Sequence, residues 1–208
     1  MRDGSRHGQW GGVMPGRTTL TFPTHDPRLR AVEPDAELVA RHAAQLCAWY
    51  NGDINADMMG ASAAMTVAEV REFWADLGAS GARAFLCFVG DTLVGDMDLR
   101  GELAAGHAEF AILIGDEGTK GRGLGLAFAT MIHVFAFRDL GLRRIYVTPK
   151  TKNERVQRLN RKLGYARDDG ALARSFLEPG DTESESQSVG ETELRAAIGA
   201  AWDGVVRT

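Results

Sequence analysis

Glycines and positive charges crowd into the middle of the chain, in the stretch EGTKGRGLGLAFAT from Glu117 to Thr130. Its first half carries alternate glycines with two basic residues among them, namely Lys120, Gly121, Arg122, Gly123 and Gly125. From Leu124 on, the residues are typical of a helix. Glycine lets backbone N–H groups approach a ligand closely, and a helix N-terminus favours anions. The stretch therefore predicts a phosphate-binding loop.

The spacing of the glycines excludes two common phosphate loops. A P-loop needs GxxxxGK[ST], and that string does not occur in the sequence. A dinucleotide-binding loop needs GxGxxG after an opening strand, whereas this chain has Leu126 at the third glycine and places the loop in mid-chain. A nucleotide-binding enzyme is therefore the least favoured interpretation.

A third pattern fits the stretch. Residues Lys120 to Ala127 resemble the acetyl-CoA pyrophosphate loop of the GNAT superfamily, [Q/R]-x-x-G-x-[G/A]. Gly123 and Gly125 match this pattern, and Lys120 stands where the family usually has Gln or Arg. Upstream, the segment HAEFAILIG is similar to the fourth strand of that family.

The segment downstream of the loop extends the resemblance. It is similar to the family pattern N-x-x-(apolar)-x-x-x-Y-x-K-x-G-[F/Y], with matches at Asn153, Val156, Lys162, Gly164 and Tyr165. Asn160 stands where the family usually has Tyr. The resemblance is specific over 107–165 and looser over 29–100, where it is closest to the branch that acetylates ribosomal-protein N-termini and polyamines.

The resemblance implies an α/β (mixed α+β) GNAT fold. Its central sheet is mixed and mostly antiparallel, splays between the fourth and fifth strands, and carries helices on both faces. Acetyl-CoA is then the co-substrate, and no metal is expected. The residues expected to bind acetyl-CoA are Ile112, Leu113, Ile114, Lys120, Gly121, Arg122, Gly123, Leu124, Gly125, Asn153, Asn160 and Lys162.

Acetyl transfer to an amine requires a base, because an alkyl amine with a pKa of about 10.4 is mostly protonated at neutral pH. The resemblance implies Glu109 as that base; otherwise it is a solvated strand residue. His107 shares its strand face and is a base, a substrate contact or a surface histidine. In much of the family the Tyr replaced here by Asn160 protonates the leaving thiolate, so Tyr146 or solvent is expected to do so.

Other candidate residues have two interpretations each. Trp49 and Tyr50, with Met58–Met59, line the acceptor pocket or simply pack in the core. Asn153 binds the cofactor arm, caps the following helix, or does both. The basic run that contains Lys152, Arg155 and Lys162 contacts the 3′-phosphate of coenzyme A or forms a solvated helix face.

Local patterns predict the elements that position these residues. Residues 29–32 form a strand before a helix whose N-terminus lies near Glu33 or Asp35, and Thr66 with Glu69 forms a capping box for a second helix. A hairpin spans 83–99 with its turn at 90–91, a strand covers 107–114, and a helix runs from the loop to Arg138. A strand, a helix ending at Gly164 and a last strand within ALARSFLE follow.

The chain of 208 residues, 44% of them hydrophobic, is expected to hold one acetyltransferase domain with extensions. These are a flexible leader (1–19, with Met14 an alternative start), the domain (20–178), an acidic Ser-rich linker (179–190) and an amphipathic helix (191–208). Leu194, Ile198 and Trp202 give that helix an apolar face. It packs on its own domain or on a partner chain, so a homodimer is possible.

Composition limits the kinds of binding partner and the cell compartment that we expect for this protein. A net charge of −4 gives no indication of nucleic-acid binding, and no apolar run is long enough to span a bilayer. Cys47 and Cys87 are expected to be free thiols, which suits a cytoplasmic protein.

The sequence thus predicts an N-acetyltransferase. It moves an acetyl group from acetyl-CoA to a primary amine by direct attack in a ternary complex. The acceptor is a protein N-terminus, a polyamine or a small amine. The alternative is a GNAT-fold acyl-CoA binding or regulatory module with little catalysis.

Overall fold

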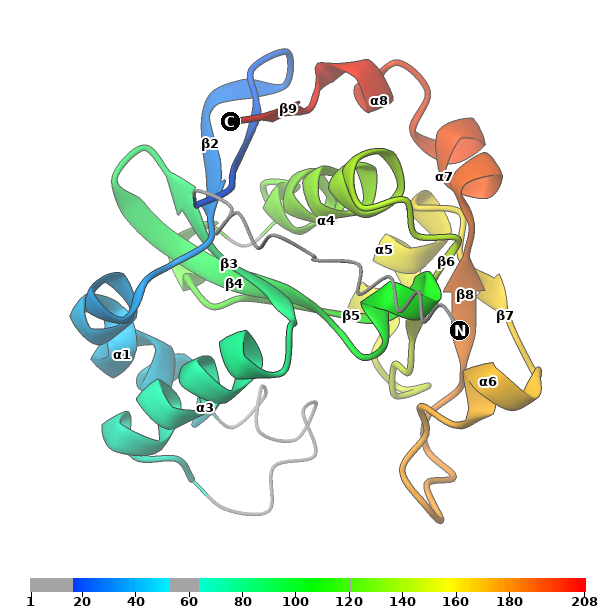
Figure 1. Ribbon diagram of the computed structural model, residues 1–208, viewed down its shortest axis with the longest axis horizontal. Helices are drawn as coiled ribbons and strands as arrows, with labels where there is room; N and C mark the ends of the chain where they lie inside the picture. Colours follow the sequence, from blue (N-terminus) through cyan, green and yellow to red (C-terminus); the bar gives the residue numbers. More distant parts are fainter. Residues whose placement is uncertain (1–16, 53–63, 120) are drawn as a thin grey trace, which may run out of the picture.

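The computed structural model describes residues 17–52, 64–119 and 121–208. In this part of the chain a single nine-stranded sheet has the order β7-β8-β6-β5-β4-β3-β2-β1-β9, and helices lie on both of its faces (Figure 1). The strands are β1 (Thr19–Phe22), β2 (Asp26–Val32), β3 (Arg83–Val89), β4 (Thr92–Arg100), β5 (His107–Ile114), β6 (Arg144–Val147), β7 (Ala166–Arg167), β8 (Gln187–Val189) and β9 (Val206–Arg207). The helices are α1 (Ala36–Tyr50), α3 (Val67–Ala79), α4 (Leu124–Val134), α5 (Glu154–Lys162), α6 (Ala171–Arg174), α7 (Glu191–Ile198) and α8 (Ala201–Gly204).

The sheet is antiparallel except where β5 meets β6. Strands β1 to β5 pair in sequence order, and the β3–β4 turn uses Gly90 with a φ of 61°. The parallel β5–β6 pair joins only His107–Glu109 to Arg144–Tyr146, so the two strands part beyond Glu109. This arrangement confirms the mixed, mostly antiparallel sheet that splays between these two strands.

The helices cover the sheet in two layers. Helices α1 and α3 pack on one face, over a core that includes Leu86 and Phe88 of β3. Helices α4, α7 and α8 pack on the other face, over a larger core that includes Phe85 and Cys87 of the same strand (Figure 1). Local caps begin the first two helices: Asp35 accepts from the Leu38 N–H, and Thr66 forms the expected capping box with Glu69.

The C-terminal quarter differs from its sequence-based prediction. Strand β8 lies within the expected flexible linker, is buried, and pairs with both β6 and β7. The expected last strand in ALARSFLE is instead the short helix α6, because Ala, Leu and Arg favour helix. The polar composition of 179–190 was misleading, since Gln187 and Ser188 find hydrogen-bond partners inside the fold.

The tail and the start of the described chain form part of the same core. The expected single helix is divided: α7 ends at Ile198 with Gly199 as its C-cap, α8 follows, and β9 then pairs with β1. Leu194 and Trp202 are buried in the α4-side core, so the tail packs on its own domain. Thr18 is buried and Thr19 begins β1, so the last residues of the expected leader belong to the folded domain.

Two further expectations concern thiols and membranes. Cys87 is a buried free thiol and Cys47 a half-buried one. Among the described residues, none of the helices is both long enough and apolar enough to cross a bilayer.

Candidate active site

The glycine loop forms the N-terminus of α4. Gly121 and Gly123 have φ values of 83° and 78°, a conformation that favours glycine. A Cβ added at either would meet no atom within 4 Å, so the need for glycine is conformational. The N–H groups of Leu126 and Ala127 both donate to the Gly123 carbonyl at 3.1 Å. The N–H groups that precede them in the first turn are therefore available to an anion.

The start of α4 lies beside the end of β5. A Cβ added at Gly125 would lie 3.8 Å from Cγ1 of Ile114. The Gly115 N–H donates to the Val94 carbonyl of β4, and alternate residues of a strand direct their backbone groups to opposite sides. Ile112 and Ile114 therefore direct theirs away from β4, toward the side that β6 leaves open. Lys120 lies outside the described residues.

Glu109 lies where β5 and β6 part. The Thr148 hydroxyl donates to its Oε1 at 3.1 Å, and Nε of Arg100 lies 3.7 Å from its Oε2. Arg100 is the residue directly opposite on β4. The Glu109 carboxylate is thus held between two strands, with about a quarter of its side chain (24%) exposed.

Two further carboxyls on β4 share the face of Glu109. Asp96, Asp98 and Arg100 occupy alternate positions, so their side chains lie on one side of the strand. Burial raises the pKa of Asp98 to about 6; nearby Glu109 adds to the shift and Arg100 opposes it. Burial and the neighbouring Asp98 raise the pKa of Asp96 to about 8. Carboxyls with raised pKa values in a site are candidates for function.

Sequence reasoning missed Asp96 and Asp98. The signal available was the alternation GDMDLR inside an otherwise apolar hairpin, which places two carboxyls on one strand face. The described residues contain no group of three or more His, Cys, Asp or Glu side chains arranged to hold a metal ion.

Three buried side-chain atoms around Glu109 have no hydrogen-bond partner. Across the described chain these are Oδ1 of Asp98, Nε of Arg100 and Nδ1 of His107. The first two lie 3.0 Å apart as an ion pair and satisfy each other, so of these three atoms only Nδ1 of His107 is left without a polar partner. A buried polar atom left unpaired costs about 1–3 kcal/mol, so such atoms in a native fold require an explanation.

An aromatic group lies next to these charges. Tyr146 is directly opposite Glu109 in the register, is 6% exposed, and stacks on Phe176 with ring centroids 5.0 Å apart. The His107 ring lies 6.3 Å from both aromatic rings. Burial and nearby Asp168 raise the pKa of Tyr146. The structure therefore brings three expected residues, Glu109, Tyr146 and His107, onto one face, and adds Phe176.

Asn160 is engaged elsewhere. It is 2% exposed, and its side-chain N–H donates to Oε1 of Gln187 on β8 at 2.8 Å. Gln187 in turn donates to Gln157 at 2.7 Å. Asn153 caps α5 by accepting from the Val156 N–H at 3.2 Å, which confirms its capping role. Lys162 is exposed in the last turn of α5.

The two aromatic residues at the end of α1 have different environments. The Tyr50 hydroxyl donates to Asp96 at 3.2 Å and accepts from the Trp74 indole at 3.3 Å. Burial raises the pKa of Tyr50, and the Asp96 charge adds to that shift. Trp49 lies over the end of β5, since a Cβ added at Gly115 would meet its ring at 2.0 Å. Met58–Met59 lies outside the described residues.

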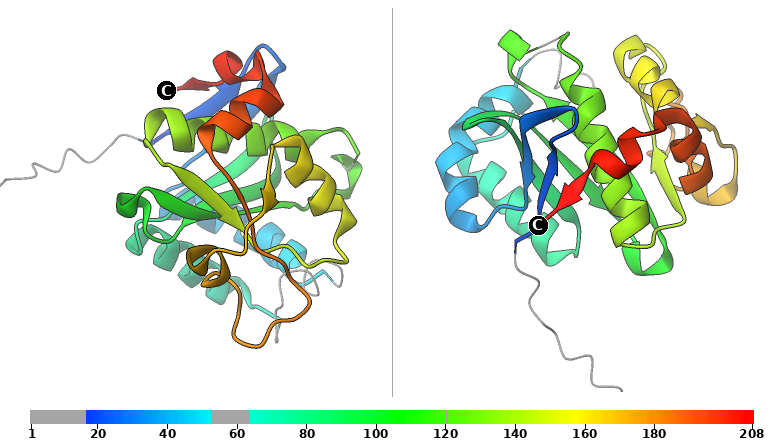
Figure 2. Two further views of the ribbon diagram at one scale, coloured as in Figure 1. Left: turned by 90° about the vertical axis from the view of Figure 1, so that its right-hand side faces the viewer. Right: turned by 90° about the horizontal axis from the view of Figure 1, so that it is seen from above.

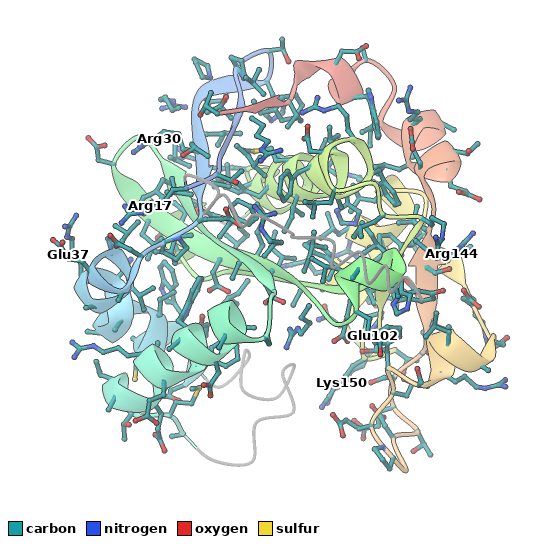
Figure 3. The ribbon with its side chains drawn as sticks, in the orientation of Figure 1. Arg17, Arg30, Glu37, Glu102, Arg144 and Lys150 are labelled. Atoms are coloured by element: carbon teal, nitrogen blue, oxygen red, sulfur yellow. The ribbon has the colours of Figure 1, made fainter. Side chains whose placement is uncertain are left out.

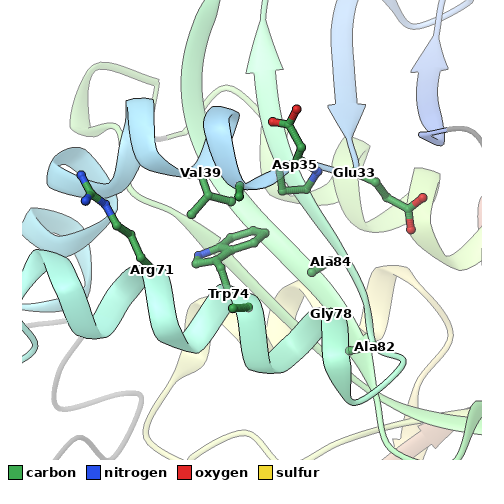
Figure 4. Close-up of a pocket in the computed structure, with 11 residues that line it drawn as sticks. Glu33, Asp35, Val39, Arg71, Trp74, Gly78, Ala82 and Ala84 are labelled. Atoms are coloured by element: carbon green, nitrogen blue, oxygen red, sulfur yellow. The ribbon is translucent and has the colours of Figure 1, made fainter.

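A cavity of about 440 Å³ lies apart from this region. It opens between the N-terminus of α1 and α3 and shares only Trp74 with the residues above (Figure 4). Figure 3 shows Glu37 on the α1 side of the sheet and Arg144 on the opposite side, by β8. The lining of the cavity is formed by Glu33, Pro34, Asp35, Ala36, Val39, Arg71, Trp74, Ala75, Gly78, Ala82 and Ala84.

Solved structures share this architecture. Spermidine N-acetyltransferase from Vibrio cholerae, in complex with CoA and spermine, matches 80% of this chain and 98% of its own at 16% identity, with a TM-score of 0.66. Aminoglycoside acetyltransferase AAC(6')-Ib in complex with coenzyme A matches 86% and 99% at 17% identity, with a TM-score of 0.63. A candidate ribosomal-protein-serine acetyltransferase from Vibrio cholerae matches 78% and 94% at 22% identity, with a TM-score of 0.59.

At these identities the likeness shows the fold alone. Comparison with curated protein sequences returns no match. The model of the acetyltransferase (GNAT) domain family matches residues 25–166, which is more than half of the chain and includes the glycine loop, Glu109 and Asn153. The chain therefore belongs to the GNAT acetyltransferase family and carries an acyltransferase domain.

Proposed function

We propose that this acyltransferase moves an acetyl group from acetyl-CoA to a primary amine by direct attack in a ternary complex. The observation that carries the proposal is the position of Glu109. It lies where β5 and β6 part, on the strand whose open edge leads to the glycine N-terminus of α4. A base, a thioester site and an anion site would then follow one another along a single strand.

The residues of the loop and of β5 fit coenzyme A. The pyrophosphate would bind the N–H groups of Gly121 to Gly125, with Arg122 adding positive charge. The backbone of Ile112 and Ile114 would pair with the pantetheine arm. A backbone N–H of this edge would polarise the thioester carbonyl. Acetyl-CoA itself supplies the activated acyl group.

Glu109 would prepare the nucleophile. The amine arrives mostly protonated, because an alkyl amine has a pKa of about 10.4. Glu109 accepts that proton directly or through water. Thr148 and Arg100 hold its carboxylate in place.

Tyr146 would protonate the leaving thiolate, with solvent as the other source. Asn160 lacks a proton of suitable acidity, and its side-chain N–H is used by Gln187. The raised pKa of Tyr146 keeps its hydroxyl protonated at neutral pH, so a proton donor lies opposite Glu109.

The engagement of Asn160 also supports a second candidate function. A GNAT domain without the Tyr on this helix would bind acyl-CoA with little catalysis and act as a regulatory module. The two functions make different demands on Glu109: only catalysis needs a base there.

The test measures free thiol released from acetyl-CoA with polyamines, amino acid amides, aminoglycosides and short peptides as acceptors. The wild type is compared with Glu109→Gln and Gly123→Trp, and a thermal shift with acetyl-CoA reports binding. We expect Glu109→Gln to lose at least about 100-fold in turnover, the lower end for a general base, with binding intact. Gly123→Trp should lose both binding and turnover. Acetyl-CoA binding without turnover on any amine would favour the regulatory module.

A further inference from the structure

The cavity between α1 and α3 is kept open by small residues. Five residues of its lining are no larger than alanine, namely Ala36, Ala75, Gly78, Ala82 and Ala84. Larger side chains at these positions would fill the space between the two helices and β3. The volume of about 440 Å³ lies in the range of small-molecule sites in proteins. The lining therefore leaves room for a ligand beside the ring of Trp74.

The charged residues of the lining differ in their pairing. Glu33 forms an ion pair with Arg83, and Asp35 forms one with Arg17. Arg71 has no ion-pair or hydrogen-bond partner within the described residues. The charge that the lining leaves uncompensated is therefore positive, which favours an anionic ligand over a cationic one.

The charges also lie on different sides of Trp74. Figure 4 shows the Arg71 guanidinium on one side of this ring and the carboxylates of Glu33 and Asp35 on the other. An anionic group at Arg71 would thus avoid the two carboxylates. The planar guanidinium matches a carboxylate, to which it donates two parallel hydrogen bonds. The rest of the lining, formed by Val39, Trp74 and the small residues, is apolar and would bind hydrocarbon.

We propose that this cavity is a second ligand site, which binds a small apolar carboxylate. The carboxylate pairs with Arg71, and the hydrocarbon body packs against Trp74 and the small residues. The site is distinct from the proposed sites for acetyl-CoA and the amine, so the proposal does not depend on the acetyltransferase mechanism above. The Trp74 indole N–H, which donates to the Tyr50 hydroxyl at 3.3 Å, reports on the ligand because the same ring lines the cavity.

The test compares para-fluorobenzoate with para-fluorobenzamide, which has the same shape and no charge. Coenzyme A is present in excess throughout, so that its own site is not available to the probes. Fluorine NMR titration gives the Kd of each probe. Proton–nitrogen NMR of the tryptophan indole groups locates the probe, and the variant Trp74→Phe identifies the Trp74 resonance.

We expect para-fluorobenzoate to bind with a Kd in the millimolar range or tighter, as for other ligands of this size. It should bind at least about fivefold more tightly than the amide, the upper end for an exposed ion pair. It should shift the indole resonance of Trp74 and not that of Trp202, which packs on the other face of the sheet. Arg71→Gln should reduce the affinity for the benzoate to that for the amide and leave the affinity for the amide unchanged.

A matched pair of variants on α3 tests whether the cavity itself holds the probe. A Cβ added at Gly78 would meet no atom within 4 Å, and leucine favours helix more than glycine does, so Gly78→Leu should fold and fill the cavity. We expect this variant to bind both probes at least about tenfold more weakly. Ala79→Leu is the control, because Ala79 is the next residue of the helix, is exposed and does not line the cavity. It should bind both probes like the wild type.

Three results would overturn the proposal. Equal affinity of the wild type for the benzoate and the amide would reject the anionic ligand class. Binding that survives Gly78→Leu, or that shifts the resonance of Trp49 and not that of Trp74, would place the probe outside the cavity. Binding of neither probe would mean that the cavity is not a site for this class of ligand.

Discussion

Asp98 carries a buried carboxyl at a measurable cost in stability. Its ordinary pKa of 3.8 rises to about 6 in the fold. The unfolded chain loses the Asp98 proton at a lower pH than the folded chain does. The contribution of Asp98 to the free energy of unfolding therefore falls as the pH rises from 3.8 to 6. A carboxyl that disfavours folding at neutral pH is expected where a protein needs it for binding or catalysis.

We therefore expect Asp98→Asn to stabilise the fold at pH 8 and to impair turnover. A shift from 3.8 to about 6 corresponds to at most about 3 kcal/mol. Urea unfolding at pH 8 and at pH 3.5 measures the difference, which should vanish at the lower pH. Equal or lower stability of the variant at pH 8 would contradict the prediction.

His133 changes the stability in the opposite direction from Asp98: its contribution is lost as the pH falls. It is fully buried; one ring nitrogen lies 2.7 Å from the Ala129 carbonyl and the other 2.7 Å from the Tyr165 hydroxyl. Burial lowers its pKa from 6.5 to about 4, so the folded state keeps the ring neutral. Stability from this group is present above pH 6.5 and is lost as the pH falls toward 4.

The expected loss over that range is about 3 kcal/mol. Comparing the wild type with His133→Gln removes the contribution of the carboxylates common to both. The wild type should lose more stability between pH 7 and pH 4 than the variant. Parallel pH profiles of the unfolding free energy would show that His133 does not titrate in this way.

At the scale of elements, α4 depends on the left-handed conformation of Gly123. We expect Gly123→Ala to destabilise the fold by about 1 kcal/mol and to weaken acetyl-CoA binding at least about tenfold. Gly141→Ala is a matched control, because Gly141 also has a positive φ, 68°, and open space around it, but lies in the turn before β6. Calorimetric titration with acetyl-CoA and urea unfolding separate the two effects.

The control Gly141→Ala should lose a similar amount of stability and should keep the wild-type affinity for acetyl-CoA. If both variants bind acetyl-CoA like the wild type, the loop does not hold the pyrophosphate. If both lose affinity equally, the effect is general destabilisation.

Whether an element could be predicted from the sequence depends on whether its signal is local. The Thr66–Glu69 capping box and the turn at Gly90 are local signals, and both were confirmed. Strand β8 has no such signal, since its polar side chains are satisfied by residues far along the chain, such as Asn160 and Arg144. The contact between Arg100 and Glu109 is equally non-local, because the β4–β5 register places these two residues opposite each other.

At the scale of the molecule, the C-terminal segment joins distant parts of the sheet. Strand β8 pairs with β6 and β7, and β9 pairs with β1 at the other end of the strand order. Between them, α7 and α8 pass on the α4 side of the sheet (Figure 2). The segment therefore ties the β5–β6 side of the site to the N-terminal strands.

Trp202 is the anchor of that segment and allows a test of it. It is 5% exposed, packs in the α4-side core, and has the Arg195 guanidinium 4.0 Å above its ring. We expect Trp202→Ala to lower the free energy of unfolding by about 3–5 kcal/mol, as for other buried aromatic residues. Val206→Ala is the control, because Val206 lies on β9 but is 42% exposed, and it should cost less than about 1 kcal/mol.

Hydrogen exchange shows whether the tail and the domain unfold together. The Thr19 N–H donates to the Thr208 carbonyl across β1 and β9 at 2.8 Å, so its exchange reports on this edge. In the wild type we expect it to exchange only with global unfolding, at the same free energy as core amides. In Trp202→Ala the edge and the core should lose protection together. Loss confined to Thr19, with the core unchanged, would mean that the tail is a separable extension and that the acetyltransferase domain is stable without it.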